Sequence, residues 1–291
     1  MKIENVPALN GGENVTRNDS TMGRMLLDMG KITPADAGRV LALQAEKGLR
    51  FGEAAQQLGL VTEAEVQMVL ASQFNYQYVQ SEQSELDPGL VAAFDPFGAE
   101  AESLRALRSQ LTGWLSGKTK SLAVVAVDDK ASSHLVTANL AIVFAQQGQR
   151  TLLVDANLRT PRQHEVFGVQ GKSGLSTALA GRTQSATLLG VKPFDKLSLL
   201  CAGAQPPNPQ ELLGMPSFAA LSEGFSRDFD VVLYDAPSLT SAADAYAVAA
   251  RAGGVLLVIR RSVARQADIR EIRSQLLRRG VEIVGSVLVD F

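Results

Sequence analysis

The stretch that decides the fold runs from Ser121 to Ala156 and reads "SLAVVAVDDKASSHLVTANLAIVFAQQGQRTLLVDA". It holds an apolar strand at 121–127, a helical pattern at 134–148 ended by a glycine, and a second apolar strand at 150–156. Strands that are apolar on both faces and joined by a helix are typical of a parallel sheet. The loop between the first strand and the helix reads "DDKASSH" (128–134) and contains no glycine.

The same alternation of strand and helix continues to the end of the chain. It predicts an α/β domain in which a mostly parallel sheet has helices on both faces. Ligands of such sheets bind at the carboxyl ends of the strands, so residues directly after strands are the candidate site. The further strands are expected at 197–203, 229–236, 253–260 and 282–291, and the helices between them at 208–226, 242–252 and 264–280.

Ahead of this domain the sequence contains an internal repeat. Residues 21–44 superpose on residues 50–73 with an offset of 29, and Thr33 and Thr62 are suited to cap helices in the two copies. We predict a small all-α domain over 21–78. It follows a disordered tail at 1–20 and precedes a segment at 79–99 that is either a linker or a chain lying over the next domain. The positions shared by the copies are Gly23/Gly52, Gly30/Gly59, Thr33/Thr62, Ala35/Ala64, Val40/Val69, Leu41/Leu70, Ala42/Ala71 and Gln44/Gln73.

The composition excludes several classes of protein. A net charge of -2 leaves no electrostatic footprint for nucleic acid, and the single cysteine, Cys201, excludes an intramolecular disulfide framework. The first twenty residues lack the apolar run of a signal peptide, and no apolar stretch approaches the ~20 residues of a spanning helix. We therefore expect a soluble, cytoplasmic protein.

Two of the strands end in an aspartate. The second strand is followed by "DANLR" (155–159) and the fourth by "DAPS" (235–238). P-loop proteins hold magnesium at such positions, directly or through water, although a strand-end aspartate can also only cap a helix. The two motifs together, after a strand–loop–helix start, favour the first interpretation. They make Asp155 and Asp235 the candidate Mg²⁺ ligands.

Residues 100–291 resemble the bacterial tyrosine kinases, which have a P-loop fold of the MinD/ParA-like class. The likeness is to the chain length determinant kinases of exopolysaccharide synthesis. It rests on "TLLVDANLRTPRQHEVFG" (151–168), "FDVVLYDAPS" (229–238), "GLSTALAGR" (174–182) and "AGAQPPNPQELLGMPSF" (202–218). The resemblance implies ATP with Mg²⁺, contact of Arg159 with the nucleotide, and docking on a membrane polysaccharide copolymerase at the inner membrane.

A further motif of that family lies in the helix expected at 100–115. Glu102, Arg105 and Arg108 match its Glu-x-x-Arg-x-x-Arg pattern, which the family uses for ring-shaped self-assembly. The spacing places the three side chains along one ridge of a helix, available for ion pairs between molecules. This predicts a homo-oligomer, or a mixed ring with active kinase subunits. A solvated charged edge is the alternative interpretation.

The phosphate loop departs from the family pattern. Phosphate binding needs a glycine-rich turn whose N–H groups face the phosphates, a lysine for the β/γ oxygens, and a hydroxyl for Mg²⁺. The family's Gly-Lys-Ser positions fall on Ser132, Ser133 and His134, and Lys130 comes three residues too early. Asn157 replaces the second acid of its motif, and an amide is no base. The predicted site (Asp155, Asn157 and Asp235) is therefore vestigial.

The acceptor of autophosphorylation is missing as well. Kinases of this type typically end in a tyrosine cluster, whereas this sequence ends in "VLVDF" (287–291). The tyrosines present are Tyr76, Tyr78, Tyr234 and Tyr246, and we expect the last two to be packed. We predict a pseudo-kinase that regulates polysaccharide chain length through protein interactions. An active ATP-dependent kinase with an unusual loop is the first alternative.

The repeat suggests a second alternative. It resembles the N-terminal domain of type II secretion and pilus ATPases, some of which bind cyclic di-GMP through two motifs that begin with Arg and end with Gln. The second copy matches with Arg50, Gly52, Gly59 and Gln73, while Thr21 takes the Arg position in the first. The chain would then be a cyclic di-GMP-responsive regulator. A helical docking module whose glycines stop helices is the other interpretation of the same residues.

Overall fold

The computed structural model describes residues 22–73, 76–77, 79, 84–117, 119–129, 131–181 and 186–290. The chain divides into two compact units, Met1–Tyr78 and Val79–Phe291. The tail expected at 1–20 and three positions of the sequence argument, Thr21, Tyr78 and Lys130, lie outside the described residues. No helix within the described ranges is long and apolar enough to cross a membrane.

The smaller unit is helical in its described part. It contains a helical segment at 22–28, followed by α2 (Pro34–Lys47), α3 (Phe51–Gln57) and α4 (Glu63–Gln73). Thr33 caps α2 and Thr62 exchanges hydrogen bonds with Glu65 at the start of α4, as the repeat predicts. The core of the unit is apolar and includes Leu26, Val40, Phe51 and Val69. The two sequence repeats therefore share one small core.

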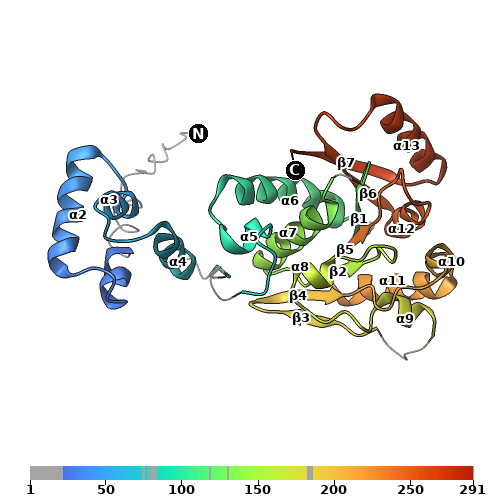
Figure 1. Ribbon diagram of the computed structural model, residues 1–291, viewed down its shortest axis with the longest axis horizontal. Coiled ribbons are helices and arrows are strands. Elements are labelled where there is room, and N and C mark those ends of the chain that lie inside the picture. The colour runs from blue at the N-terminus through green and yellow to red at the C-terminus, as the bar shows by residue number, and fades with distance from the viewer. Residues whose placement is uncertain are drawn as a thin grey trace, which may run out of the picture. The chain divides into compact units, whose positions relative to one another are not determined.

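The larger unit is built on a seven-stranded sheet with the order β3-β4-β2-β5-β1-β6-β7 (Figure 1). Every neighbouring pair is parallel except β3 and β4, which are antiparallel. The mostly parallel α/β fold expected from the sequence is confirmed. The strands are β1 (Ser121–Ala126), β2 (Thr151–Asp155), β3 (Leu189–Val191), β4 (Phe194–Leu200), β5 (Val231–Ala236), β6 (Gly254–Arg260) and β7 (Glu282–Val289).

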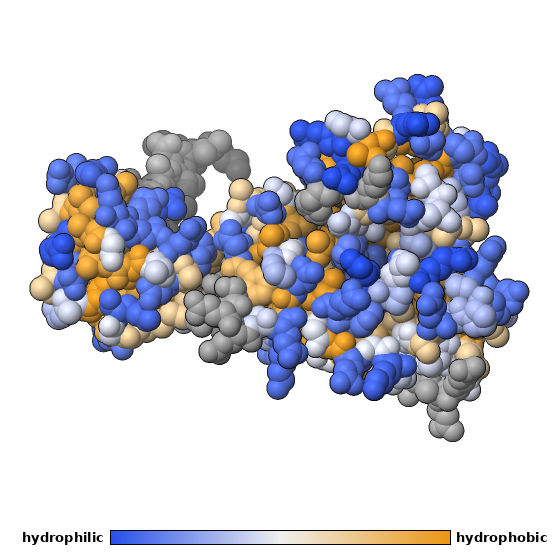
Figure 2. Space-filling model, viewed as in Figure 1, coloured by the Kyte–Doolittle hydropathy of each residue, from blue (hydrophilic) through white to orange (hydrophobic). Residues whose placement is uncertain are grey.

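Helices cover both faces of this sheet (Figure 1). Successive residues of β1 alternate between two apolar cores, Leu122 facing one and Ala123 the other. The first core is closed by α5 (Val91–Phe94), α6 (Ala99–Leu115), α7 (Ser133–Gln146) and α8 (Gln163–Val166). The second is closed by α9 (Leu175–Leu179), α10 (Pro209–Gly214), α11 (Pro216–Asp228), α12 (Asp244–Ala252) and α13 (Gln266–Arg278). Figure 2 shows hydrophilic side chains over α13, the outermost of these helices.

The segment at 84–99 differs from a free linker. Leu90, Ala92 and Ala93 are fully buried in the first core. The Asn139 side chain of α7 accepts a hydrogen bond from the Ala92 N–H at 2.9 Å and donates to the Gly89 carbonyl at 2.8 Å. These bonds satisfy backbone groups that would otherwise be buried without partners. The segment is therefore part of the larger unit and lies over α7, the other expectation drawn from its sequence.

Candidate functional site

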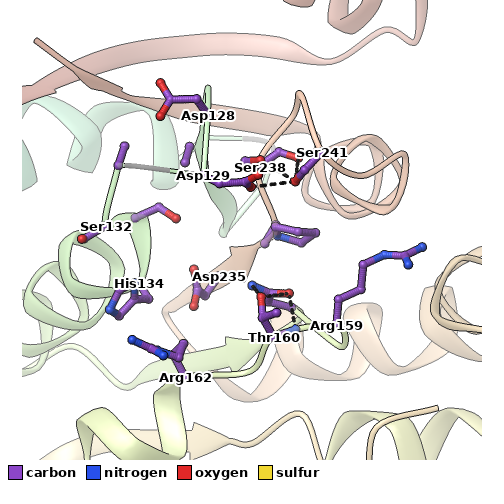
Figure 3. Close-up of a pocket in the computed structure, with 16 residues that line it drawn as sticks. Asp128, Asp129, Ser132, His134, Arg159, Thr160, Arg162, Asp235, Ser238 and Ser241 are labelled. Carbon is purple, nitrogen blue, oxygen red and sulfur yellow. Dashed lines mark hydrogen bonds between the residues drawn. The ribbon is translucent and has the colours of Figure 1, made fainter. Parts of the chain in front are cut away.

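A pocket of about 580 Å³ lies at the carboxyl ends of β1, β2 and β5 (Figure 3). Its walls come from the loop after β1, the loop after β2 and the residues after β5. The register of the sheet pairs Asp155 with Asp235, which brings the two predicted carboxylates side by side. The pocket thus occurs where strand-end residues predicted a site. Its lining includes Asp128, Asp129, Ser132, Ser133, His134, Asn157, Arg159, Thr160, Arg162, Asp235, Ser238 and Ser241.

The two carboxylates are buried and do not have equal access to the pocket. Asp155 is 0% exposed and lies behind the lining, whereas Asp235 is 2% exposed and contributes to it. Burial raises the pKa of Asp155 to about 7, although its carboxylate accepts N–H bonds from Asn157, Arg162 and Gln163. Burial, and then the charge of Asp155, raise the pKa of Asp235 well above its usual value. No group of three potential metal-ligating side chains occurs within the described ranges.

Gln163 is a site residue that the sequence patterns did not identify. Its side chain is fully buried, and its Nε2 donates to Asp235 Oδ2 at 2.7 Å and to the His134 carbonyl at 3.0 Å. Its backbone N–H donates to Asp155 Oδ2 at 3.0 Å. Gln163 therefore joins the ends of β2 and β5 to the first turn of α7. Its position directly after the "RTPR" turn (159–162) was the available signal.

The loop after β1 contributes two carboxylates, those of Asp128 and Asp129, to the lining of the pocket. Asp129 Oδ1 accepts hydrogen bonds from the hydroxyls of Ser238 and Ser241, toward which Figure 3 shows it turned. Ser133 is buried, and burial together with the charge of Arg162 lowers the pKa of His134, so its imidazole is neutral near pH 7. The described loop residues therefore supply negative charge and hydroxyls, and no cation.

The other two predicted residues at this pocket, Arg159 and Asn157, form hydrogen bonds with neighbouring protein side chains and backbone groups. Arg159 donates to both carboxylate oxygens of Asp244, at 2.6 and 3.2 Å. Asn157 accepts from the Thr160 N–H at 3.1 Å and donates to its hydroxyl at 3.1 Å, which closes a local turn. Arg159, expected to contact the nucleotide, and Asn157, expected in the vestigial catalytic site, thus also stabilise the loop after β2. Both residues still line the pocket.

The three charged residues expected along one ridge lie on α6, and both arginines make contacts within the chain. Arg105 pairs with Glu102 at 2.7 Å and donates to the Pro96 carbonyl, while Arg108 donates to the Val143 carbonyl of α7 at 2.7 Å. Arg108 thus bonds across to α7, whereas Arg105 bonds within α6 and to the segment just before it. Glu102 alone of the three is largely exposed. Self-assembly through this motif stays a prediction.

In the smaller unit, the glycines of the repeat have structural roles. A Cβ on Gly52 would lie 3.0 Å from Val66 Cγ1, so the glycine permits close approach of α3 and α4. Gly59 has φ +67°, the left-handed conformation that favours glycine after a helix. Arg50 precedes α3 with its backbone N–H bound to Glu53, and Gln73 ends α4. Cyclic di-GMP binding by these residues stays a prediction.

Comparison with known proteins relates the chain to a family. No protein-family model matches the chain. Over 199 residues (68% of the chain) it is 36% identical to a putative tyrosine-protein kinase EpsB of Ralstonia nicotianae. It is 27% identical to a putative tyrosine-protein kinase CapB of Staphylococcus aureus, over 66% of the chain. The match spans 85% of the CapB length and only 26% of the EpsB length.

Solved structures agree with these relatives. The kinase domain of the Escherichia coli tyrosine kinase ETK matches with a TM-score of 0.66 and 29% identity, over 72% of this chain and 82% of that one. The chain belongs to the bacterial tyrosine kinase (BY-kinase) family. The cell division ATPase MinD of Pyrococcus furiosus matches with a TM-score of 0.50 and 23% identity, over 58% of this chain and 72% of that one. This likeness confirms the MinD-like P-loop fold of the larger unit.

Proposed function

We propose that this BY-kinase relative is a pseudo-kinase that regulates exopolysaccharide polymerisation and chain length through protein contacts. The observation that carries the proposal is the bonding of Asp129, whose carboxylate lines the pocket and accepts from Ser238 and Ser241. With Asp128 and Asp235 it gives the pocket wall three carboxylates. Weak or absent ATP binding follows from this charge.

The electrostatic reason is the charge of the nucleotide. A triphosphate needs cations and oriented N–H groups around its oxygens, and each lost charged contact to a transferring phosphoryl group costs ~3 kcal/mol or more. Here Ser132, Ser133 and His134 replace the glycine, lysine and hydroxyl of the cradle. Arg159 is bound to Asp244, which leaves Arg162 as the cation nearest the loop among the described lining residues. The residues present do not fit a triphosphate with Mg²⁺.

The tyrosines support the same proposal. Tyr234 is 0% exposed inside β5 and Tyr246 is 7% exposed in α12, so neither hydroxyl is offered to another active site. Burial raises the pKa of Tyr234 to about 12 and also raises that of Tyr246. The partners we propose are a membrane polysaccharide copolymerase, which would hold the protein at the inner membrane, and active kinase subunits in a mixed ring.

Isothermal titration of ATP with Mg²⁺ into the full chain tests the proposal. We expect no measurable heat of binding from the wild type, because the loop opposes the charge of the phosphates. A variant that restores the family pattern, Ser132→Gly, Ser133→Lys and His134→Ser, together with Asp129→Gly, is expected to gain ATP binding. Its matched control carries Ser133→Met in place of Ser133→Lys and should gain little. Strong Mg²⁺-dependent binding by the wild type would contradict the pseudo-kinase.

The second candidate is an active ATP-dependent tyrosine kinase. The observation in its favour is the register pairing of Asp155 with Asp235 at adjacent strand ends, with Asp235 facing the pocket. Transfer of radiolabelled phosphate from ATP to protein separates the two candidates. Incorporation that disappears in Asp235→Ala would favour the kinase, and equal background in both proteins would favour the pseudo-kinase.

A further inference from the structure

A second pocket, of about 560 Å³, lies at the amino end of β1, whereas the first pocket lies at the carboxyl ends of the strands. It is bounded by the residues that precede and begin β1, by the second half of α11 and by the end of α12. No family motif quoted above falls on these positions. The described lining residues are Gly117, Thr119, Lys120, Ser121, Ala219, Ser222, Glu223, Ser226, Arg227, Arg251 and Ala252.

The walls of this second pocket carry net positive charge. Three cations, Lys120, Arg227 and Arg251, line it with one acid, Glu223. In the described part of the chain neither guanidinium pairs with a carboxylate, and the Arg251 guanidinium carbon lies 5.9 Å from the centre of the Phe218 ring. Lys120 Nζ donates to the Phe229 carbonyl at 3.2 Å, and an ammonium has two further protons to donate. Hydrogen-bond donors are therefore available from three elements: Lys120 before β1, Arg227 of α11 and Arg251 of α12.

Three serines, Ser121, Ser222 and Ser226, contribute hydroxyl groups to the lining of the second pocket. Ser121 and Ser222 are 4% and 6% exposed. Ser121 Oγ lies 3.2 Å from Ser226 Oγ, and Ser222 Oγ lies 2.7 Å from the buried Tyr234 phenol. Burial raises the pKa of Tyr234 to about 12, so the phenol keeps its proton and can donate it to Ser222. The Ser222 proton is then free to point at an acceptor in the pocket, since a hydroxyl both accepts and donates.

We propose that this second pocket binds a phosphomonoester through Lys120, Arg227 and Arg251, with the serine hydroxyls as additional donors. A phosphomonoester carries close to two negative charges at neutral pH and three acceptor oxygens. Arginine binds such oxygens in pairs, and lysine binds them as a point charge. A carboxylate has one charge and two oxygens, and would leave part of this donor set unused. The site is independent of the first pocket, so it holds whether or not that pocket binds ATP.

Calorimetric titration of the full chain with inorganic phosphate and with glucose 1-phosphate tests the site, against chloride at matched ionic strength. We expect saturable binding of both phosphates. The double variant Arg227→Gln/Arg251→Gln should bind at least about ten-fold more weakly, because two charge-assisted contacts are lost. Arg251→Lys should keep part of the affinity. Lys120→Gln, on another wall, should weaken binding too and serves as the readout if the double variant fails to fold.

Two matched controls locate the bound anion. Arg273→Gln removes one positive charge from the exposed face of α13, and Arg162→Gln removes one from the first pocket. Both are expected to bind phosphate like the wild type. The proposal is overturned if the wild type binds neither phosphate, or if the double variant and Lys120→Gln bind as tightly as the wild type. Loss of binding in Arg162→Gln alone would also overturn it, since the anion would then occupy the first pocket.

Discussion

Replacement of Arg159 by methionine is expected to lower the free energy of unfolding by about 2 to 4 kcal/mol. Asp244 is 1% exposed at the start of α12, and Arg159 supplies it with two N–H donors. The Arg159 side chain is 47% exposed, so the pair is half-buried, but its removal leaves the Asp244 charge buried without compensation, which is destabilising. Methionine keeps most of the apolar stem of the side chain, so the loss reports the charge. Urea denaturation of the two proteins measures the difference.

The matched control for this prediction is Arg150→Met. Arg150 pairs with Asp230 at 2.9 Å, but that pair is 54% and 40% exposed, and such pairs contribute ~0–1 kcal/mol. A second check is Arg159→Met combined with Asp244→Asn, which should recover much of the lost stability because the buried charge is gone. Equal losses for Arg159→Met and Arg150→Met would show that Asp244 does not depend on Arg159. A much larger loss for Arg159→Met would mean that Arg159 is needed at Asp244. Turning Arg159 away toward a nucleotide would then cost a similar free energy.

The fold was accessible from sequence because parallel strands buried on both faces are apolar without interruption. β1, β2 and β5 follow that pattern, and a pocket lies at their carboxyl ends, where the sequence predicted a site. β3 was missed because it has three residues at the edge of the sheet, too few for a periodic pattern. The segment at 84–99 was ambiguous for a related reason: its place over α7 involves hydrogen bonds of Ala92 with Asn139 and Gln146, which its own periodicity does not show.

The details of the site depend on contacts between segments far apart in the sequence. Arg159 and Asp244 are separated by 85 residues, and Gln163 and Asp235 by 72. Residue types and spacing identified Arg159 and Asp235 as site residues, but not their partners. Likewise, the spacing of Arg105 and Arg108 placed them on one ridge of α6, but it did not show that Arg105 bonds back to Pro96 or that Arg108 reaches Val143 of α7. Local patterns predicted the elements, and tertiary contacts determined the bonding.

Replacement of Asp235 by asparagine is expected to raise stability by about 1 to 3 kcal/mol at pH 8 in metal-free buffer. Two carboxylates buried side by side repel each other and lose their hydration when ionised. Asparagine removes one charge and can still accept the hydrogen bond from Gln163 Nε2. In an intact magnesium site the same change would remove a metal ligand. Thermal melting in EDTA measures the effect, and Asp195→Asn, at an exposed position, should leave the melting temperature unchanged.

The same pair predicts how stability depends on pH. Both carboxyls have folded-state pKa values above the unfolded values, Asp155 at about 7, so the folded protein binds protons more tightly between about pH 4 and 7. Stability contributed by the pair therefore falls as pH rises through that window and is lowest above it. His134 acts in the opposite sense, since its lowered pKa favours unfolding as pH drops below about 6.5.

Because His134 is present in both proteins, its contribution cancels when the wild type is compared with Asp235→Asn. We expect the stabilisation by Asp235→Asn to be largest at pH 8 and to shrink toward pH 5, where the wild-type pair already holds a proton. A stability difference between the two proteins that is constant from pH 5 to pH 8 would mean that the ionisation of Asp155 and Asp235 does not destabilise the wild type. A variant less stable than the wild type at pH 8 would mean that Asp235 must be ionised to hold Gln163. Asp235 would then stabilise the fold that it is predicted to destabilise.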